Sequence, residues 1–334
     1  MQKHLLVFIF IILFYSANAQ NNFTLLNRIA LPGDGGWDYV AIDDANQHLF
    51  VSHGNEVNVV DITTGKPLAV IPNTKGVHGI AIANDLNEAF ISNGKDSSVT
   101  VIDLKTFSLI TKIYVTGKNP DAILFDNFSQ RIFTFNGKGK NATVIDAATN
   151  KVIGTIDMGG KPEFAVSNHS GKIFVNIENM NEVVMIDAQS FTIEKRFSVN
   201  PGNEPSGLAM DIANNRLFSV CGNKTLVITD ALTGKLIANL PIGDDADAVV
   251  YDDATHNIYS SNGEGTLTVI HQNNANSYNV VETIPTQKGA KTLALCKSNR
   301  HLYLPTAEYD EVMENGKKHK KMKPNSFVIL EMGE

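Results

Sequence analysis

The sequence predicts an all-β fold, a seven-bladed β-propeller with four-stranded antiparallel blades, and three observations support this. A phrase of the form Val-Ile-Asp followed by turn residues recurs along the chain, as in TVIDAATNK from Thr143. Its successive acidic positions lie 42, 43, 41, 43, 41 and 60 residues apart. Short runs rich in Val, Ile, Phe and Thr fill each interval, and such runs are typical of strands. Repeats of about 40 residues with four strands each are typical of propeller blades. The recurring positions are Asp61, Asp103, Asp146, Asp187, Asp230, His271 and Glu331.

The third repeat illustrates how one blade is built. Apolar or alternating runs at 121–126, 131–136, 142–146 and 151–158 predict four strands, which we name A to D from the axis outward. Turn residues separate them, including an Asn-Gly pair after the second run, a pair that favours tight hairpins. We expect the recurring Asp to open the turn between strands C and D by accepting hydrogen bonds from nearby backbone amides.

The last repeat lacks its outer strand, and the start of the chain supplies a replacement. Runs at 291–295, 301–305 and 326–332 provide strands A to C, after which the chain ends. The segment 23–31, FTLLNRIAL, has the pattern of a D strand but no blade of its own. We therefore expect this N-terminal strand to complete the last blade and close the ring, since closure removes two exposed sheet edges.

The first residues have the features of a cleavable signal peptide. A short basic start precedes an apolar run from Leu5 to Tyr15, which is too short to span a bilayer, and Ala17-Asn18-Ala19 is a small-residue cleavage site. We expect residues 1–19 to be removed before Gln20, and 20–334 to form a single propeller domain. The protein is then expected to be periplasmic or secreted, with no membrane span.

Charge and cysteine content narrow the function classes. The formal net charge of −7 gives no general attraction for nucleic acid or for an anionic membrane. The two cysteines, Cys221 and Cys296, fall in repeats that are not neighbours. We expect both to be free, buried thiols.

The repeat phrase and its flanking strands resemble a known family. The TVID phrase, the inner strands that begin PDAILFD and PSGLAMD, and the SNG and FNG hairpins are similar to the YVTN-repeat, YncE-like seven-bladed propellers of exported bacterial proteins. The resemblance covers 23–334 and implies the fold and an exported location. It also implies a range of functions, because one relative has been associated with nucleic-acid binding and the wider superfamily includes lactonases and propeller subunits of redox enzymes.

A ring of polar residues at the starts of the A strands predicts the functional site. Loops before A and after B share one face of a propeller, where binding residues gather on a rigid scaffold. The ends of the B strands add residues to the same face, namely His53, Asn93, Asn136, Glu178, Asn262 and Glu308. Trp37 begins the first blade, where it either stacks a ligand at the rim of this face or packs between blades. We expect the ligand-binding candidates to be Trp37, Asp38, His53, His78, Asp121, Glu163, Asp247, Lys291 and Glu308, with Ser206 completing the ring.

Converging carboxylates raise each other's pKa or recruit a cation, so the ring is also a candidate metal site. Its possible ligands are Asp38, His78, Asp121, Glu163 and Asp247. Oxygen-rich ligation suits Ca²⁺ or Mg²⁺, whereas a contribution from histidine suits Zn²⁺ or Mn²⁺. The alternative is that these residues solvate the channel mouth.

The long final interval contains a charged segment, 308–325, between strands B and C of the last blade. Its first half is acidic and its second half carries five lysines. One interpretation is a lid over the acidic mouth, because loops of this length are often functional. The other is a solvated charged hairpin whose two halves pair with each other.

Three functions remain open at this point. The first is a binding or scaffold protein that recognises a small ligand or an exported protein or peptide; we expect a monomer, and the sequence contains no familiar catalytic motif. The second is a metal-assisted hydrolase, lactonase or lyase, with His53 or His78 as the base. The third, single-stranded nucleic-acid binding, rests on the family alone and is opposed by the acidic charge.

Overall fold

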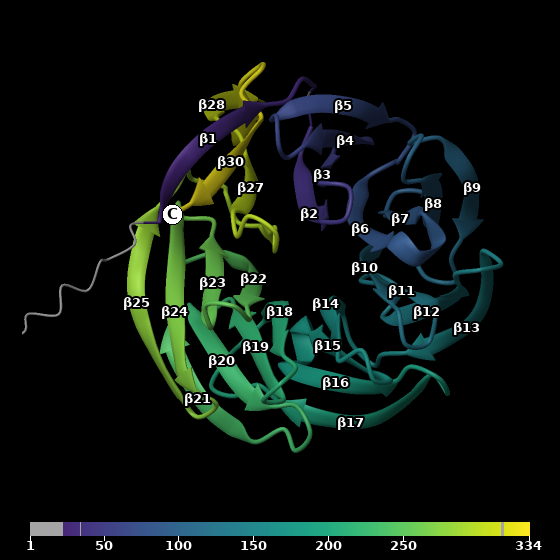
Figure 1. Ribbon diagram of the computed structural model, residues 1–334, viewed down its shortest axis with the longest axis vertical. Helices are drawn as coiled ribbons and strands as arrows, with labels where there is room; N and C mark the ends of the chain where they lie inside the picture. Colours follow the sequence, from purple (N-terminus) through teal and green to yellow (C-terminus); the bar gives the residue numbers. More distant parts are fainter. Residues whose placement is uncertain (1–22, 34, 315–316) are drawn as a thin grey trace, which may run out of the picture.

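The fold consists of small antiparallel sheets arranged around a central axis (Figure 1). The computed structural model describes residues 23–33, 35–314 and 317–334, so the expected signal peptide lies outside the described residues. There are seven four-stranded sheets and one two-stranded sheet among them. The prediction of an all-β chain built from four-stranded antiparallel blades is confirmed.

The first three sheets follow one another along the chain. Sheet 1 consists of β2 (Trp37–Asp43), β3 (His48–His53), β4 (Glu56–Asp61) and β5 (Lys66–Ile71). Sheet 2 consists of β6 (Val77–Ala83), β7 (Glu88–Asn93), β8 (Ser98–Asp103) and β9 (Leu109–Tyr114). Sheet 3 consists of β10 (Pro120–Asp126), β11 (Arg131–Asn136), β12 (Asn141–Asp146) and β13 (Lys151–Asp157).

The next three sheets repeat the same order of strands. Sheet 4 consists of β14 (Pro162–Ser167), β15 (Lys172–Ile177), β16 (Glu182–Asp187) and β17 (Thr192–Ser198). Sheet 5 consists of β18 (Pro205–Asp211), β19 (Arg216–Cys221), β20 (Thr225–Asp230) and β21 (Leu236–Pro241). Sheet 6 consists of β22 (Ala246–Asp252), β23 (Asn257–Asn262), β24 (Thr266–Asn274) and β25 (Ser277–Pro285).

Sheet 7 joins the two ends of the described chain. It consists of β26 (Ala294–Leu295), β27 (Leu302–Thr306), β30 (Val328–Gly333) and β1 (Thr24–Ala30). Strand β1 pairs antiparallel with β30, so the N-terminal strand lies at the outer edge of the last sheet. The helical segments within the described ranges are two short 3-10 turns, η1 (Asn84–Leu86) and η2 (Glu178–Met180). Among the described residues, no helix has the length and apolar character needed to cross a membrane.

An aromatic residue at one position of each second strand fills the space between sheets. These residues are Phe50, Phe90, Phe133, Phe174, Phe218, Tyr259 and Tyr303, and none is more than 3% exposed. Each large ring removes apolar surface from water, which is the main favourable contribution to folding. Because neighbouring sheets supply the contacts, the core runs around the ring rather than filling one centre.

The recurring Asp of the sequence phrase stabilises the turn between the third and fourth strands, as predicted. Asp146 accepts hydrogen bonds at 2.8 Å from the Thr149 amide and at 2.6 Å from its hydroxyl. Asp103 and Asp187 do the same for Thr106 and Ser190. Hydrogen bonds from Thr149 lower the pKa of Asp146. These carboxylates are therefore structural.

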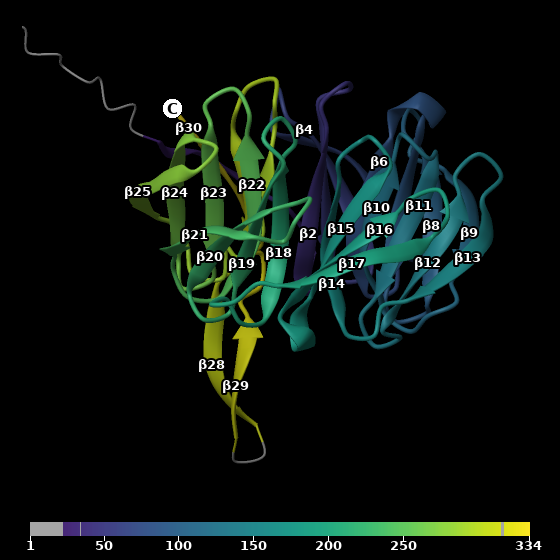
Figure 2. The ribbon, with the colours of Figure 1, turned by 90° about the horizontal axis from the view of Figure 1, so that it is seen from below.

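The loops that precede the first strand and those that join the second and third strands lie at one end of the propeller, which we call the funnel face. Register places the start of β10, the end of β11, the start of β12 and the end of β13 at this end. Segment 308–325 leaves the same end as a hairpin of β28 (Tyr309–Glu314) and β29 (Lys317–Met322), which extends away from the ring (Figure 2). Lys318 lies 3.2 Å from Glu311, and Lys323 lies 2.9 Å from Glu308. The described parts of the segment thus form a paired, charged hairpin.

Candidate functional site

Six of the seven predicted ring residues lie at a β-bulge in an inner strand, whereas Lys291 precedes the short inner strand β26. In the first six sheets, the pairing of the inner strand with its neighbour shifts register immediately after the strand's first residue. Bulges bend a strand and redirect side chains, and they are common beside functional sites. The residues at these bulges are Asp38, His78, Asp121, Glu163, Ser206 and Asp247.

Buried polar side chains of the second strands hold the bulged backbone. The Ser92 hydroxyl donates to the Asp121 carbonyl at 2.5 Å, and the Ser261 hydroxyl donates to the Lys291 carbonyl at 2.6 Å. The Asn176 amide does the same for Ser206 at 2.9 Å. A bulge leaves backbone groups without ladder partners, and burying such groups unpaired is costly. These hydrogen bonds join one sheet to the next and fix the distances between neighbouring residues of the polar ring.

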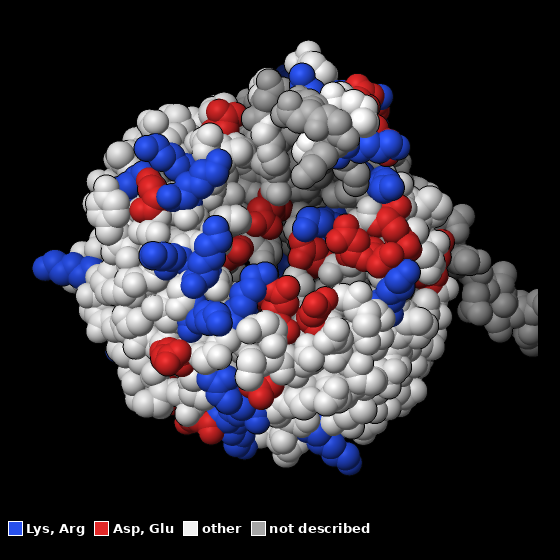
Figure 3. Space-filling model, turned by 180° about the vertical axis from the view of Figure 1, so that it is seen from behind, with Lys and Arg blue, Asp and Glu red and all other residues white. Residues whose placement is uncertain are grey.

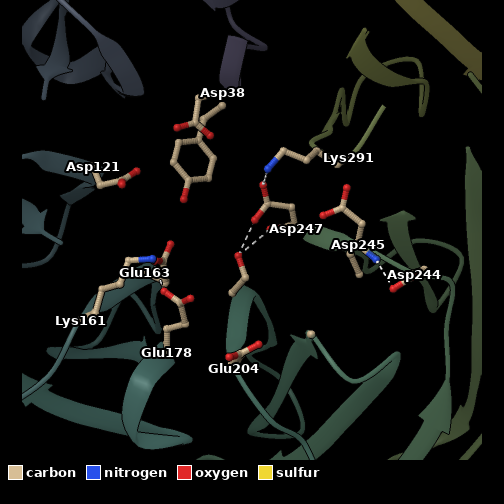
Figure 4. Close-up of a pocket in the computed structure, with 14 residues that line it drawn as sticks. Asp38, Asp121, Lys161, Glu163, Glu178, Glu204, Asp244, Asp245, Asp247 and Lys291 are labelled. Atoms are coloured by element: carbon tan, nitrogen blue, oxygen red, sulfur yellow. Dashed lines mark hydrogen bonds and ion pairs between the residues drawn. The ribbon is translucent and has the colours of Figure 1, made fainter. Parts of the chain in front are cut away.

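The ring opens into an acidic cavity of about 460 Å³ on the funnel face (Figures 3 and 4). Eight carboxylates and two lysines line it, together with the buried Tyr39. The charged residues are Asp38, Asp121, Lys161, Glu163, Glu178, Glu204, Asp244, Asp245, Asp247 and Lys291. Carboxylates facing a shared volume repel one another, so the cavity favours a cation.

Asp38, His78 and Asp121 form one cluster at the cavity wall. The His78 Nδ1 atom lies 2.5 Å from an Asp38 carboxylate oxygen and 3.6 Å from one of Asp121. Burial lowers the pKa of His78, but the hydrogen bond to Asp38 and the charge of Asp121 outweigh it, so that pKa is raised. Burial and the charge of Asp38 raise the pKa of Asp121 to about 6. One ligand atom from each of the three residues could hold a metal, because these atoms lie within 4.8 Å of one another.

Glu163, Glu178 and Lys161 form a second cluster, and Figure 4 shows their side chains pointing toward one another. Lys161 Nζ lies 2.6 Å from Glu163 and also contacts Glu178. Burial and a hydrogen bond to Glu178 raise the pKa of Glu163 to about 8, although Lys161 acts against this. Burial raises the pKa of Glu178, but the hydrogen bonds from Glu163 and Lys161 outweigh it and lower that pKa. Glu163 therefore carries the proton that the two carboxyls share.

Lys291 and Asp247 form a third cluster on the other side of the cavity. Lys291 Nζ lies 2.6 Å from Asp247, whose other oxygen accepts a hydrogen bond at 2.6 Å from the Ser206 hydroxyl. Burial lowers the pKa of Lys291, but the charge and hydrogen bond of Asp247 raise it overall. Both cavity lysines are therefore engaged by carboxylates, which leaves the cavity with excess negative charge.

The structure brings most of the predicted residues together and places others elsewhere. Asp38, Asp121, Glu163, Asp247 and Lys291 line the cavity, and His78 contacts two of them.

Besides His78, which contacts the lining, three predicted ligand-binding residues are not in the cavity lining. His53 is 1% exposed; its ring stacks on Phe327 with centroids 4.1 Å apart, and its Nδ1 lies 3.1 Å from Asn58. The ring of Trp37 packs on Phe327 and on Tyr309 at the base of the hairpin. Glu308 is exposed and pairs with Lys323.

The ends of the second strands lie at the funnel face, as expected, and Glu178 lines the cavity, but most of the other predicted side chains there do not. Asn93, Asn136 and Asn262 are fully buried, like His53. The Asn93 amide donates to Ser98 and Thr100 on the next strand of its own sheet. Asn136 and Asn262 make the equivalent hydrogen bonds to Thr143 and Thr268, so these amides are held by the third strand of their own sheets.

Several cavity residues are not among the candidates predicted from sequence. The loops that lead into the inner strands contribute these residues from two or three positions before the ring positions, namely Lys161, Glu204, Asp244 and Asp245. Tyr39 follows Asp38 and packs on Phe164, with ring centroids 5.3 Å apart. The repeat spacing could have identified these residues, because it assigns the same loop positions in every sheet.

The fold and site define the chain as a β-propeller with an acidic cavity where the inner strands begin. A family model described as YNCE-like beta-propeller matches residues 30–172, and this confirms the predicted resemblance to the YncE-like propellers over that part of the chain. No curated protein matches the chain.

Solved structures show the same fold at low sequence identity. A chain of the mitotic checkpoint complex has a TM-score of 0.78 and 13% identity, covering 100% of this chain and 99% of that chain. The RRP9 WD40 repeats have a TM-score of 0.78 and 10% identity, covering 94% and 100%. The Kuenenia stuttgartiensis hydrazine synthase has a TM-score of 0.71 and 17% identity, covering 82% and 94%. These likenesses concern the fold alone.

Proposed function

We propose that this chain is an exported β-propeller scaffold that binds a partner protein at the funnel face, with a cationic side chain of the partner entering the acidic cavity. The observation that carries the proposal is the charge of the cavity, where eight carboxyl groups, of which Glu163 is protonated, face two lysines. A Lys or Arg side chain offers hydrogen-bond donors and positive charge at the end of a long stem, so it can reach such a cavity. Propellers with partner proteins, such as the chain in the mitotic checkpoint complex, make a scaffold role a natural use of the fold.

The proposal includes a closed ring of seven blades, a monomeric state and export. The seven four-stranded sheets and the pairing of β1 with β30 support a ring whose last blade is completed by the N-terminal strand. The basic start, apolar run and small-residue site within residues 1–19 support export. Mass spectrometry of the protein from the cell envelope or medium tests export, because it should find Gln20 at the N-terminus.

Titration with short peptides tests the cavity. We expect the tripeptide Gly-Lys-Gly to bind, whereas Gly-norleucine-Gly, which has a neutral stem, does not. Changing Asp38→Asn together with Asp247→Asn should weaken binding of the Lys peptide about thirtyfold, because each change removes one partly buried charge worth on the order of 1 kcal/mol. Equal binding of the two peptides would contradict a site selective for cations.

A metal-assisted hydrolase, lactonase or lyase is the second candidate, favoured by the cluster of Asp38, His78 and Asp121. Neutral His78 offers Nδ1 to a metal, but protonated His78 donates from the same atom to Asp38, so the proton and the metal compete. We expect Zn²⁺ or Mn²⁺ to raise the melting temperature of EDTA-treated protein more at pH 8 than at pH 6, and Ca²⁺ and Mg²⁺ to serve as comparisons. No shift with any ion would remove this candidate.

Of the two predicted bases, His78 would then be a ligand and His53 is buried away from the cavity. Nucleic-acid binding stays outside the proposal, because the cavity carboxylates would repel a phosphate backbone.

A further inference from the structure

Loops of sheets 2 and 3 at the funnel face repeat a Gly-Lys pattern. It occurs as Lys75-Gly76, Gly94-Lys95, Gly117-Lys118 and Gly137-Lys138-Gly139-Lys140. We call Lys75, Lys95, Lys118, Lys138 and Lys140 the lysine arc. All five are exposed, and none has an ion pair with any described side chain. The one acidic residue in these loops, Asp96, is 3.1 Å from Lys112 and is thereby neutralised.

Backbone hydrogen bonds hold these lysines side by side at the mouth of the ring. The Lys95 amide donates to the Lys75 carbonyl at 3.1 Å. In sheet 3, the Gly139 amide donates to the Lys118 carbonyl at 3.0 Å, which places Lys118 between the loop positions of Lys138 and Lys140. Like charges held at adjacent positions are destabilising, and here no internal partner among the described residues offsets the cost.

The fold itself does not require lysine at these positions. In sheet 6 the same backbone bond joins the Glu264 amide to the Asp244 carbonyl at 3.3 Å. In sheet 5 the corresponding carbonyl belongs to Asn203, which accepts from Gly222 at 2.8 Å. The accepting carbonyl, three residues before the ring position, thus belongs to lysine in two sheets, to an aspartate in another and to an asparagine in a fourth. Because folding does not require lysine at these positions, we attribute the lysines to binding at this surface.

The funnel face is divided by charge as a result. Figure 3 shows Lys and Arg gathered on one side of the central hollow, and Asp and Glu in the hollow and on its other side. The acidic side includes Glu204, Asp244, Asp245 and Glu264, at the loops of sheets 4 to 6. A long uniform polyanion would meet repulsion there. A protein surface, by contrast, can place negative groups over one side and a positive group over the other.

We propose that the lysine arc binds an acidic segment of the same partner protein whose cationic side chain enters the cavity. This inference rests on the proposed function and adds the charge pattern of the partner. A nucleic acid fits the arc less well, because the four arc loops contain no aromatic residue on which a base could stack. An anionic polysaccharide would be repelled like any other uniform polyanion.

Binding of a hexaglutamate peptide with acetylated and amidated ends, followed by calorimetry or fluorescence anisotropy, tests the arc. The variant Lys95→Glu with Lys138→Glu should bind it about tenfold more weakly, because two attractions become repulsions of roughly the size of surface ion pairs. The matched control is Lys105→Glu with Lys235→Glu, two exposed lysines at the opposite end of the ring, which gives the same net charge. The proposal would be overturned if both variants bound hexaglutamate equally weakly, or if neither bound it more weakly than wild type.

Two further probes separate this inference from the proposed function. Asp38→Asn with Asp247→Asn should weaken binding of Gly-Lys-Gly and leave binding of the hexaglutamate peptide intact, so each site can fail alone. A peptide that joins hexaglutamate to a terminal Lys through a Gly-Ser linker should bind wild type more tightly than either part, because the second contact becomes intramolecular. If the joined peptide gains nothing, or if oligo-dT of equal charge binds the arc more tightly than hexaglutamate, the shared acidic partner is refuted.

Discussion

Glu163→Gln is the substitution that best tests the electrostatics of the cavity. Glu163 is 8% exposed and shares a proton with Glu178, beside Lys161. Glutamine has the same shape and, like the protonated acid, can donate a hydrogen bond to the Glu178 carboxylate. The variant therefore mimics the protonated state and removes only the ability to ionise.

The sign and size of the effect follow from the pKa of Glu163, which is raised from its ordinary value of 4.5 to about 8. Between these values the unfolded chain loses the proton and the folded chain keeps it, so the folded state loses stability as pH rises through this window. The loss is about 1.4 kcal/mol for each pH unit, or about 5 kcal/mol at most. Glu178 has a lowered pKa and contributes in the opposite direction, so we expect a net gain for the variant of about 1–2 kcal/mol at pH 9.

Thermal melting of wild type and variant at pH 5, 7 and 9 provides the assay. A gain of about 1–2 kcal/mol raises the melting temperature of a chain of this size by about 2–3 °C. We expect equal melting temperatures at pH 5 and a rising advantage of Glu163→Gln toward pH 9. Glu264→Gln, at an exposed loop position, is the control and should show no such trend. A difference between Glu163→Gln and wild type that does not change with pH would refute the shared-proton description of this cluster.

Further predictions concern the histidine cluster, the ring and the hairpin. Asp38→Asn removes the acceptor of His78 Nδ1, so the pKa of His78 should fall in an NMR titration; an unchanged pKa would contradict the ion pair. Removal of residues 23–31 leaves β30 without its outer partner, so the protein should melt at lower temperature and self-associate in sedimentation; a monomer of unchanged stability would argue against closure. Phe133→Ala should cost about 3–5 kcal/mol in urea unfolding, because it empties a fully buried position, and a cost under about 1 kcal/mol would contradict its place in the core. Replacing 310–321 by Asn-Gly should change the melting temperature by less than about 2 °C, since an isolated hairpin contributes little stability; a larger fall would mean that it supports the ring.

The blades could be predicted from sequence because their determinants are local and repeated. Asp146 with its Thr three residues later, and an aromatic such as Phe133 in the second strand, recur at fixed spacing, so each repeat supports the assignment of the others. Free, buried cysteines were also predicted and are found at Cys221 and Cys296. These features depend on neighbours in sequence or on strand alternation, both of which can be seen in a printed chain.

The site was predicted only in part, because its geometry depends on contacts between sheets. The starts of the inner strands identified Asp38, Asp121 and Glu163. However, the bulges that direct them depend on register between strands, and Ser92 supports Asp121 from the preceding sheet. His53 has a residue type suited to chemistry, but its stacking on Phe327, far along the chain, decides that it is buried.

The pairing of β1 with β30 has a consequence for the order in which the protein folds. Strand β1 is among the first described residues to be synthesised, yet its hydrogen-bonding partner is the last strand of the chain. Contacts so distant in sequence form slowly, because a large loop must close before any contact is gained. The earlier sheets can form from neighbouring strands while β1 waits with an unpaired edge. We therefore expect the joining of these two strands to be the final step of folding, which a chain that lacks β30 cannot complete.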